Sequence, residues 1–308
     1  MGMIIADAIM KPRRPTGTWV AGGDTSDYVA TSTDPTTLWT QRATTFPTSV
    51  IRSIFYGNSY YVAVSYHGEI ETSLDPTVSW ALSTTVFGHG PIYTVFYGNG
   101  MWVCAGSSGH LATAALDPTT AWTENTIGGF GINAIYTVAY GNGLWVAAGS
   151  NGQLATAIAP DGVWTMRTSS FGSSDIYSVR YGNGIWVATG SSGKIATSTS
   201  PTTLWTQRTS SFGVGDLIYG VAYGDDGYWT AVGPFGKIAW STSPALLWTQ
   251  NTFASAEYFE SVAQANNIWV AVSYDGNIVT ASNPSLLWTL RTPPAGTPIA
   301  FYTVAHGG

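Results

Sequence analysis

Short apolar-rich runs with strand character, which contain many Val, Ile, Thr, Tyr and Trp residues and are bounded by turn residues, follow one another along nearly the whole chain. In the segment 176–209 the runs read IYSVRY, IWVATG, KIATST and LWTQRT, and the separators read GNG, SSG and SPTT. Runs rich in β-branched and aromatic residues between turn residues predict β-strands, and Gly-Asn-Gly supplies the positive φ angles that a tight hairpin needs. Proline lacks a backbone donor, so each proline segment is expected in the connection between the third and fourth strands.

This four-run unit recurs seven times. Tryptophans in one register mark the copies, with successive gaps of 41, 42, 42, 41, 43 and 40 residues, and each follows a proline by four positions. They are Trp39, Trp80, Trp122, Trp164, Trp205, Trp248 and Trp288. Four-stranded antiparallel units of about 40 to 45 residues cannot cover both faces alone and are typical of propeller blades. The repeat therefore predicts an all-β fold, a seven-bladed β-propeller.

The two ends of the chain carry two parts of one copy. The first copy has a second strand (18–21), a third (28–32) and a fourth (38–42) but no first strand, whereas the chain ends in FYTVAHGG (301–308), which matches the first strand of the other copies. Pairing these ends would close the ring and remove exposed sheet edges. The alternatives, a β-solenoid or two separate sandwiches, do not explain this split copy.

The expected domains follow from this register. Residues 1–17 form an N-terminal arm and residues 18–308 form the propeller. Blade 1 combines 18–49 with 299–308, and blades 2 to 7 are 50–91, 92–134, 135–175, 176–217, 218–258 and 259–298.

A second aromatic series opens the second strand of every copy. It consists of Trp19, Tyr61, Trp102, Trp145, Trp186, Trp229 and Trp269. Large aromatic residues at equivalent positions suit packing between blades, so both tryptophan series are predicted to lie in the core. The single cysteine, Cys104, excludes an internal disulfide, and alanine at the aligned positions of the other copies predicts a small apolar site there.

Composition limits the classes of function. Hydrophobic residues make up 44% of the 308 residues and charged residues 9%, with a net charge of -6. Few, scattered basic residues do not favour nucleic acid, and no apolar run is long enough to span a membrane. We expect no cofactor and no metal, because the four histidines lack the spacing of metal ligands.

A motif in the turn before each marker tryptophan suggests a family. STDPTTLW at 32–39 and SLDPTVSW at 73–80 have the Ser, Asp and Trp spacing of an Asp-box, and ALDPTTAW at 115–122 nearly has it. The later copies place Ala159, Ser200, Ser243 and Asn283 where the Asp should stand. The chain thus resembles Asp-box, or BNR-like, propellers, in which the box is a folding device. The glycine-rich repeat is also similar to propellers encoded by tailed phages and some bacteria.

The Asp-box class includes sialidases, which have six blades and a cluster of three arginines. Here Arg42, Arg167, Arg208 and Arg291 recur at one position of the fourth strand, where they are expected near the outer rim and cannot converge. No pair of carboxylates is evident at one end of the channel. We therefore predict that the protein is not an enzyme, with a glycoside hydrolase as the least favoured hypothesis.

One ring of residues could bind a ligand. The second residue of the inner strand is Arg52, Tyr93, Tyr136, Tyr177, Tyr219, Glu260 or Tyr302, depending on the copy. If the inner strands line the axis, these side chains gather near the mouth of the central channel and could stack on sugars and bond their hydroxyls. The alternative is that the tyrosines merely pack between blades.

A second set varies between copies at the start of the third strand. It comprises Tyr28, Glu69, His110, Gln153, Lys194, Lys237 and Asn277. This variation fits either a surface adapted to a partner or unconstrained exposure to solvent.

The segment before the repeat is apolar and then basic, MIIADAIM followed by KPRRP. This order is the reverse of a secretory signal. A disordered tail is one interpretation. The other is an arm that docks the propeller into a larger assembly through Ile4, Ile5, Ile9, Met10, Arg13 and Arg14.

These features favour a non-enzymatic interaction module, a virion component of the phage tail, baseplate or capsid exterior that is made in the host cytoplasm. Its expected partners are other virion or assembly proteins. The second hypothesis is a lectin-like receptor-binding protein that recognises host surface glycans, and a cytoplasmic location is the alternative to the virion.

Overall fold

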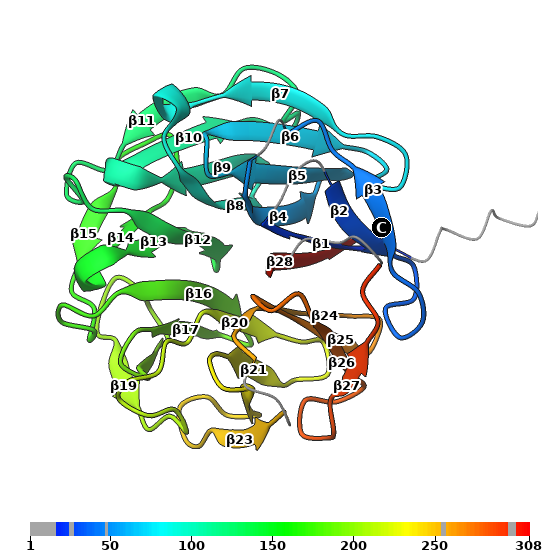
Figure 1. Ribbon diagram of the computed structural model, residues 1–308. Coiled ribbons are helices and arrows are strands. Elements are labelled where there is room, and N and C mark those ends of the chain that lie inside the picture. Colours follow the sequence, from blue (N-terminus) through cyan, green and yellow to red (C-terminus); the bar gives the residue numbers. More distant parts are fainter. Residues whose placement is uncertain (1–16, 25–27, 47–48, 254–256, 295–299) are drawn as a thin grey trace, which may run out of the picture.

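The computed structural model describes residues 17–24, 28–46, 49–253, 257–294 and 300–308. Seven four-stranded antiparallel sheets stand around a central axis, with the first strand of each blade innermost and the fourth at the periphery (Figure 1). The predicted all-β, seven-bladed propeller is confirmed. Within the described ranges, the helical elements are three short 3-10 turns, η1 (Phe87–His89), η2 (Ser107–Gly109) and η3 (Ser150–Gly152).

Each blade has four strands, which follow one another from the axis outward. Blade 1 contains β28 (Ala300–Gly307), β1 (Thr18–Asp24), β2 (Tyr28–Ser32) and β3 (Thr40–Ala43). Blade 2 contains β4 (Ile51–Gly57), β5 (Tyr60–Ser65), β6 (Glu69–Ser73) and β7 (Ala81–Thr85). Blade 3 contains β8 (Ile92–Gly98), β9 (Met101–Gly106), β10 (His110–Ala114) and β11 (Thr123–Thr126). Blade 4 contains β12 (Ile135–Gly141), β13 (Leu144–Gly149), β14 (Leu154–Ala157) and β15 (Thr165–Arg167).

The remaining three blades follow the same order. Blade 5 contains β16 (Ile176–Gly182), β17 (Ile185–Gly190), β18 (Ile195–Ser198) and β19 (Thr206–Arg208). Blade 6 contains β20 (Gly220–Tyr223), β21 (Trp229–Val232), β22 (Lys237–Ser241) and β23 (Thr249–Thr252). Blade 7 contains β24 (Phe259–Ala265), β25 (Ile268–Ser273), β26 (Ile278–Ala281) and β27 (Thr289–Arg291).

The ring closes as the split copy predicts. Strand β28 pairs antiparallel with β1, and Trp19 lies opposite His306 in this ladder. The C-terminal strand therefore supplies the inner strand of the blade that the N-terminal part of the chain begins.

The fourth strands begin later than the sequence pattern indicates. Strand β3 starts at Thr40 rather than at Leu38, and the other fourth strands likewise start after the marker tryptophan. Leu38 is 71% exposed, whereas Trp39 is buried. The indole of Trp39 donates a hydrogen bond to the carbonyl oxygen of Pro35, at 3.2 Å, which holds the tryptophan in the turn. The same bond in blades 3, 4, 6 and 7 accounts for the four-residue spacing between Pro and Trp in those blades.

The core is divided into seven hydrophobic clusters, each placed between neighbouring blades. The tryptophans and Tyr61 that open the second strands are at most 3% exposed, as predicted, and all marker tryptophans except half-buried Trp164 are buried. Cys104 is fully buried in its alanine-sized site, and burial raises the pKa of its thiol. The protein is therefore held together mainly by contacts between blades.

The repeated Tyr-Gly pair at the end of the inner strand also joins blades. The ring of Tyr181 lies against Gly141 of the preceding blade, so closely that a Cβ there would overlap the ring. Tyr97, Tyr140, Tyr223 and Tyr56 lie against glycines of their preceding blades in the same way. Within its own blade, Tyr181 also contacts Trp186, with 5.1 Å between ring centroids. This packing accounts for the phrase YGNG, because only glycine leaves room for the ring.

The turn before the marker tryptophan has the hydrogen bonds expected of a folding device. The carboxylate of Asp34 accepts hydrogen bonds from the backbone N–H and the hydroxyl of Thr36, at 3.0 and 2.6 Å. These bonds lower the pKa of Asp34. Asn283 makes the same pair of bonds with Ser285, at 2.9 and 2.6 Å, so the turn persists where the Asp is replaced.

Candidate binding site at the mouth of the central channel

A β-bulge lies near the start of the inner strand in six blades. In blade 2 the pairing passes from Ile51 with Ser65 to Ser53 with Val64, which leaves Arg52 without a partner in the ladder. The other bulged residues are Tyr93, Tyr136, Tyr177, Glu260 and Tyr302. Tyr219 stands immediately before β20 in the seventh. A bulge re-aims a side chain, and here it turns the unpaired residue toward the axis.

The structure brings all seven residues of the predicted ring together. They line one narrow cavity of about 100 Å³ at the end of the channel where the inner strands begin. Four tyrosines form a continuous series of ring contacts, Tyr93 to Tyr136 at 5.3 Å, Tyr136 to Tyr177 at 5.6 Å and Tyr177 to Tyr219 at 5.4 Å between centroids. The tyrosines thus pack on one another across neighbouring blades and also face the cavity, so packing does not prevent them from contacting a ligand.

Arg52 lies between the first tyrosine of this series, Tyr93, and the fifth tyrosine of the ring, Tyr302. Its guanidinium carbon lies 4.6 Å from the ring centroid of Tyr302 and 5.8 Å from that of Tyr93. These distances allow cation–π attraction on both sides. We call the seven residues the tyrosine mouth.

Glu260 is the carboxylate among the residues that line this cavity. Burial raises its pKa from 4.5 to about 7, and the positive charge of Arg52 only partly opposes this rise. The carboxyl group is therefore about half ionised at neutral pH, which makes the charge of the mouth sensitive to pH.

Four phenols of the mouth hold their protons more firmly than a free tyrosine does. Burial raises the pKa of Tyr177 and Tyr219 to about 12, and it also raises the pKa of Tyr93 and Tyr302. Each of these four phenols can therefore donate a hydrogen bond at neutral pH while its ring offers an apolar face. The arrangement suits a ligand with mixed polar and apolar groups.

Two tyrosines that the sequence reasoning missed extend the mouth outward. Tyr66 contacts Tyr93 at 6.4 Å, and Tyr274 contacts Tyr302 at 6.0 Å between centroids. They are 43% and 48% exposed. The signal was present, because blades 2 and 7 read Ser-Tyr at 65–66 and 273–274 where blades 3, 4 and 5 read Gly-Ser.

The variable set at the third strand lies apart from the mouth and largely holds linkers in place. The Lys194 ammonium donates to the carbonyl of Phe171 at 2.7 Å, and Lys237 forms an ion pair with Asp216. Gln153 donates to Gly129, Asn277 donates to Glu257, and Glu69 accepts from Ser65. His110 contacts the Phe87 ring, and Tyr28 is half-buried on β2. Fixing the linker that arrives from the preceding blade thus gives most of these residues a structural role.

Other candidate positions do not form a site. Arg42, Arg167, Arg208 and Arg291 lie on the outermost strands of four blades, and the last three donate to a threonine of the adjacent strand. No cluster of potential metal ligands occurs in the described part of the chain. The arm residues Ile4, Ile5, Ile9, Met10, Arg13 and Arg14 lie outside the described residues. No helix among the described elements has the length and apolar character needed to cross a membrane.

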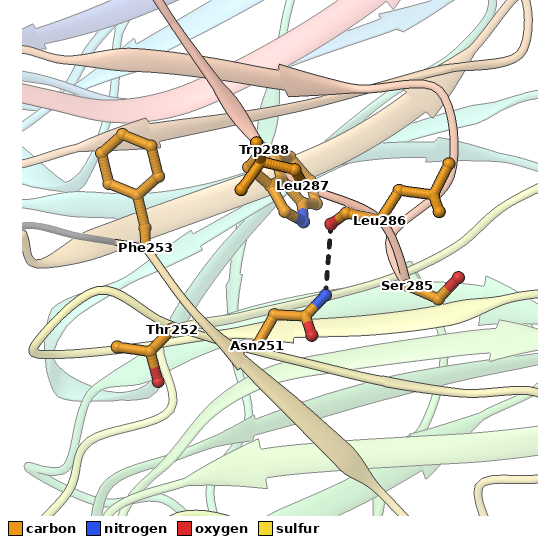
Figure 2. Close-up of a pocket in the computed structure, with 7 residues that line it drawn as sticks. All are labelled: Asn251, Thr252, Phe253, Ser285, Leu286, Leu287 and Trp288. Carbon is orange, nitrogen blue, oxygen red and sulfur yellow. Dashed lines mark hydrogen bonds between the residues drawn. The ribbon is translucent and has the colours of Figure 1, made fainter.

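A larger hollow of about 380 Å³ lies at the outer rim between blades 6 and 7. Figure 2 shows Asn251 pointing toward the turn of Ser285 and Leu286, where its amide donates to the Leu286 carbonyl at 3.2 Å. Leu287, which also lines this hollow, is 88% exposed. The lining residues are uncharged, so this hollow lacks the charged groups that distinguish the mouth.

The sequence matches no protein-family model and no curated protein sequence. Solved structures share the fold. YCF48 bound to D1 peptide is 14% identical over 86% of this chain and 88% of that one, with a TM-score of 0.68. YCF48 from Cyanidioschyzon merolae is 17% identical over 87% and 92%, with the same score. A chain of the mitotic checkpoint complex is 9% identical over 99% and 90%, also with a TM-score of 0.68. At these identities the likeness establishes the propeller fold alone.

Proposed function

We propose that the protein is a non-enzymatic interaction module that binds a segment of a partner protein at the tyrosine mouth. The observation that carries this proposal is the convergence of five tyrosines, Arg52 and Glu260 on one cavity. Aromatic faces next to hydroxyl groups and an arginine are typical of residues that dominate binding interfaces.

The mouth is built for recognition. Its ring contacts fix the tyrosine side chains before a ligand arrives, which lowers the entropy cost of binding. Glycoside hydrolysis, the least favoured hypothesis, uses two carboxylates that flank the bond, whereas in this cavity Glu260 is accompanied by Arg52. A peptide segment with polar and apolar side chains fits this chemistry. One structural neighbour, YCF48 bound to D1 peptide, supports peptide binding as a use of such a propeller.

Site-specific crosslinking tests the proposal. A photoreactive phenylalanine analogue placed at Tyr136 should capture a protein partner in the producing cell, and the crosslinked peptide can be identified by mass spectrometry. The same analogue at Leu204, which is 75% exposed on the outer rim, is the control. Equal capture at the two positions, or capture at Leu204 alone, would contradict a binding site at the mouth.

Host glycans are the second class of ligand that the mouth could accept, because stacked tyrosine rings and phenol groups also suit sugars. A glycan array with the wild type and with Tyr136→Ala and Tyr177→Ala distinguishes the two. Binding that both substitutions abolish would favour a receptor-binding lectin over a protein-interaction module.

The finer proposal is that the module belongs to a phage virion, in the tail, baseplate or capsid exterior. Its support is the likeness of the glycine-rich repeat to propellers encoded by tailed phages. Mass spectrometry of purified particles tests it directly, since a virion component must co-purify with infectious particles at constant stoichiometry.

A further inference from the structure

Beneath the tyrosine mouth, a belt of hydroxyl groups surrounds the channel at the third residue of the inner strands. Each hydroxyl oxygen accepts a hydrogen bond from a backbone N–H of the next blade, at 3.0 to 3.4 Å. The belt consists of Ser53, Thr94, Thr137, Ser178, Ser261 and Thr303, and Gly220 takes this position in blade 6.

These hydroxyl groups are available as hydrogen-bond donors. Each uses an oxygen lone pair for the N–H of the next blade, and no acceptor for its proton is found among the described residues. A hydroxyl has one proton to give, so each can donate into the channel that it lines. The belt is therefore rich in donors, which favours a negatively charged ligand.

Two residues further along the inner strand, the copies differ sharply. This level consists of Phe55, Phe96, Ala139, Arg180, Ala222, Ala263 and Ala305. The small alanines leave open a cavity of about 270 Å³, which Phe55, Ala222, Ala263 and Ala305 help to line. Arg180 lines both this cavity and the narrow cavity of the tyrosine mouth, so it lies where the two cavities meet.

Arg180 is a cation without an acidic partner among the described residues. Its guanidinium donates to the carbonyl of its neighbour Val179 at 2.8 Å and lies 5.7 Å from the ring centroid of Phe96. The ion pair that the described residues form joins Lys237 and Asp216, and neither of these residues lines the channel cavities. Burial lowers the pKa of Arg180 to about 10, so the group is still charged at neutral pH. A half-buried charge without a counter-ion has lost part of its hydration, and an anion would relieve that cost.

We propose that the middle of the channel binds a small organic carboxylate, with Arg180 as its charge partner. The planar guanidinium can hold both carboxylate oxygens, and the belt hydroxyls can donate to whichever lone pairs remain. The apolar body of the acid lies against Phe55 and the alanine wall. This inference does not depend on what the tyrosine mouth binds.

The cavity size argues for an acid with a hydrocarbon part over a bare ion. A volume of about 270 Å³ is many times that of a single water-sized particle, and Phe55, Ala222, Ala263 and Ala305 give its lining an apolar part beside Arg180 and the belt hydroxyls. Chloride would leave most of this volume to water, whereas a ring or short chain of carbon atoms would fill it.

Calorimetric titration of the full chain with benzoate and acetate is the primary test, with chloride, sulfate and phosphate as inorganic arms. We expect saturable, one-to-one binding of benzoate, tighter than that of acetate or any inorganic anion. Arg180→Met should weaken benzoate binding roughly 10- to 100-fold, since it removes a charge-assisted pair. Arg208→Met, which removes a rim arginine, should leave binding unchanged.

A second variant tests the cavity itself while the charge stays in place. Ala263→Leu should fill the hollow and abolish benzoate binding although Arg180 is intact. If Arg180→Met fails to fold, the guanidinium Nε–H resonance of Arg180 in the wild type provides an independent readout, and benzoate should shift it.

The carboxylate could also arrive on a protein segment that enters from the mouth. An acetylated Gly-Gly-Phe peptide with a free C-terminal carboxylate, compared with its C-terminal amide, distinguishes this source. If the peptide acid binds and benzoate does not, the free acid is wrong as the ligand. No saturable binding of any anion, equal binding by Arg180→Met, or inorganic anions binding as tightly as benzoate would overturn the proposal. None of these outcomes bears on partner capture at Tyr136, so failure here is distinguishable from failure of the proposed function.

Discussion

The raised pKa of Glu260 predicts a specific dependence of stability on pH. In the unfolded chain this carboxyl titrates near 4.5, and in the folded protein near 7. Between these values the folded state holds a proton that the unfolded state has lost, so the free energy of unfolding falls as pH rises. A difference of about 2.5 units, at 1.36 kcal/mol each, corresponds to a loss of about 3 kcal/mol at most. Glu260→Gln removes this titration.

Urea unfolding followed by tryptophan fluorescence measures the effect, because urea does not screen charges as guanidinium does. The stability of Glu260→Gln relative to the wild type should rise by about 3 kcal/mol at most between pH 4 and pH 8. Other titrating groups cancel in this difference. Asp161→Asn, which removes an exposed carboxylate on the outer turn of blade 4, is the control. Parallel pH curves for Glu260→Gln and the wild type would refute the reasoning.

Three further predictions concern the stability of the propeller. Gly141→Ala should destabilise the protein by about 1 to 3 kcal/mol in urea unfolding, because its Cβ would overlap the Tyr181 ring, whereas Gly128→Ala, which has open space, should be neutral. Phe301→Ala should cost about 3 to 5 kcal/mol, since this fully buried side chain belongs to the strand that closes the ring; a cost below 1 kcal/mol would argue against closure by β28. Asn283→Ala should cost about 1 kcal/mol through loss of its two turn bonds, and Asn283→Asp should restore stability, which thermal melts would show.

The blade count, the strand order and the ring closure could be predicted because each copy repeats the same local chemistry. Gly-Asn-Gly dictates a hairpin, and the split copy dictates which ends must meet. The start of the fourth strand could not be placed correctly, because Leu38 and Trp39 read as strand residues by composition. Only the indole hydrogen bond to Pro35 reveals that the tryptophan belongs to the turn.

The residues of the tyrosine mouth could be predicted from the sequence, but the β-bulge that places them could not. A strict two-residue alternation does not reveal a bulge, so it cannot predict that the consecutive residues Tyr136 and Thr137 both line the cavity. The role of the variable set was not predictable either. The bond from Lys194 to the Phe171 carbonyl joins residues 23 positions apart, across a linker whose path depends on the packing of both blades.

The seven copies, compared at equal depth in the channel, distinguish residues that the propeller fold requires from residues that it does not. At the first and fourth positions of the inner strand every copy has an apolar residue that is buried in the blade. The fold therefore determines the type of residue at these two positions. At the fifth position six copies are apolar and blade 5 has Arg180. Blade packing does not require a charge there, because alanine serves in four copies. A half-buried charge at a position where blade packing does not need one, beside hydroxyl groups that can also donate, is what the proposed carboxylate ligand would account for.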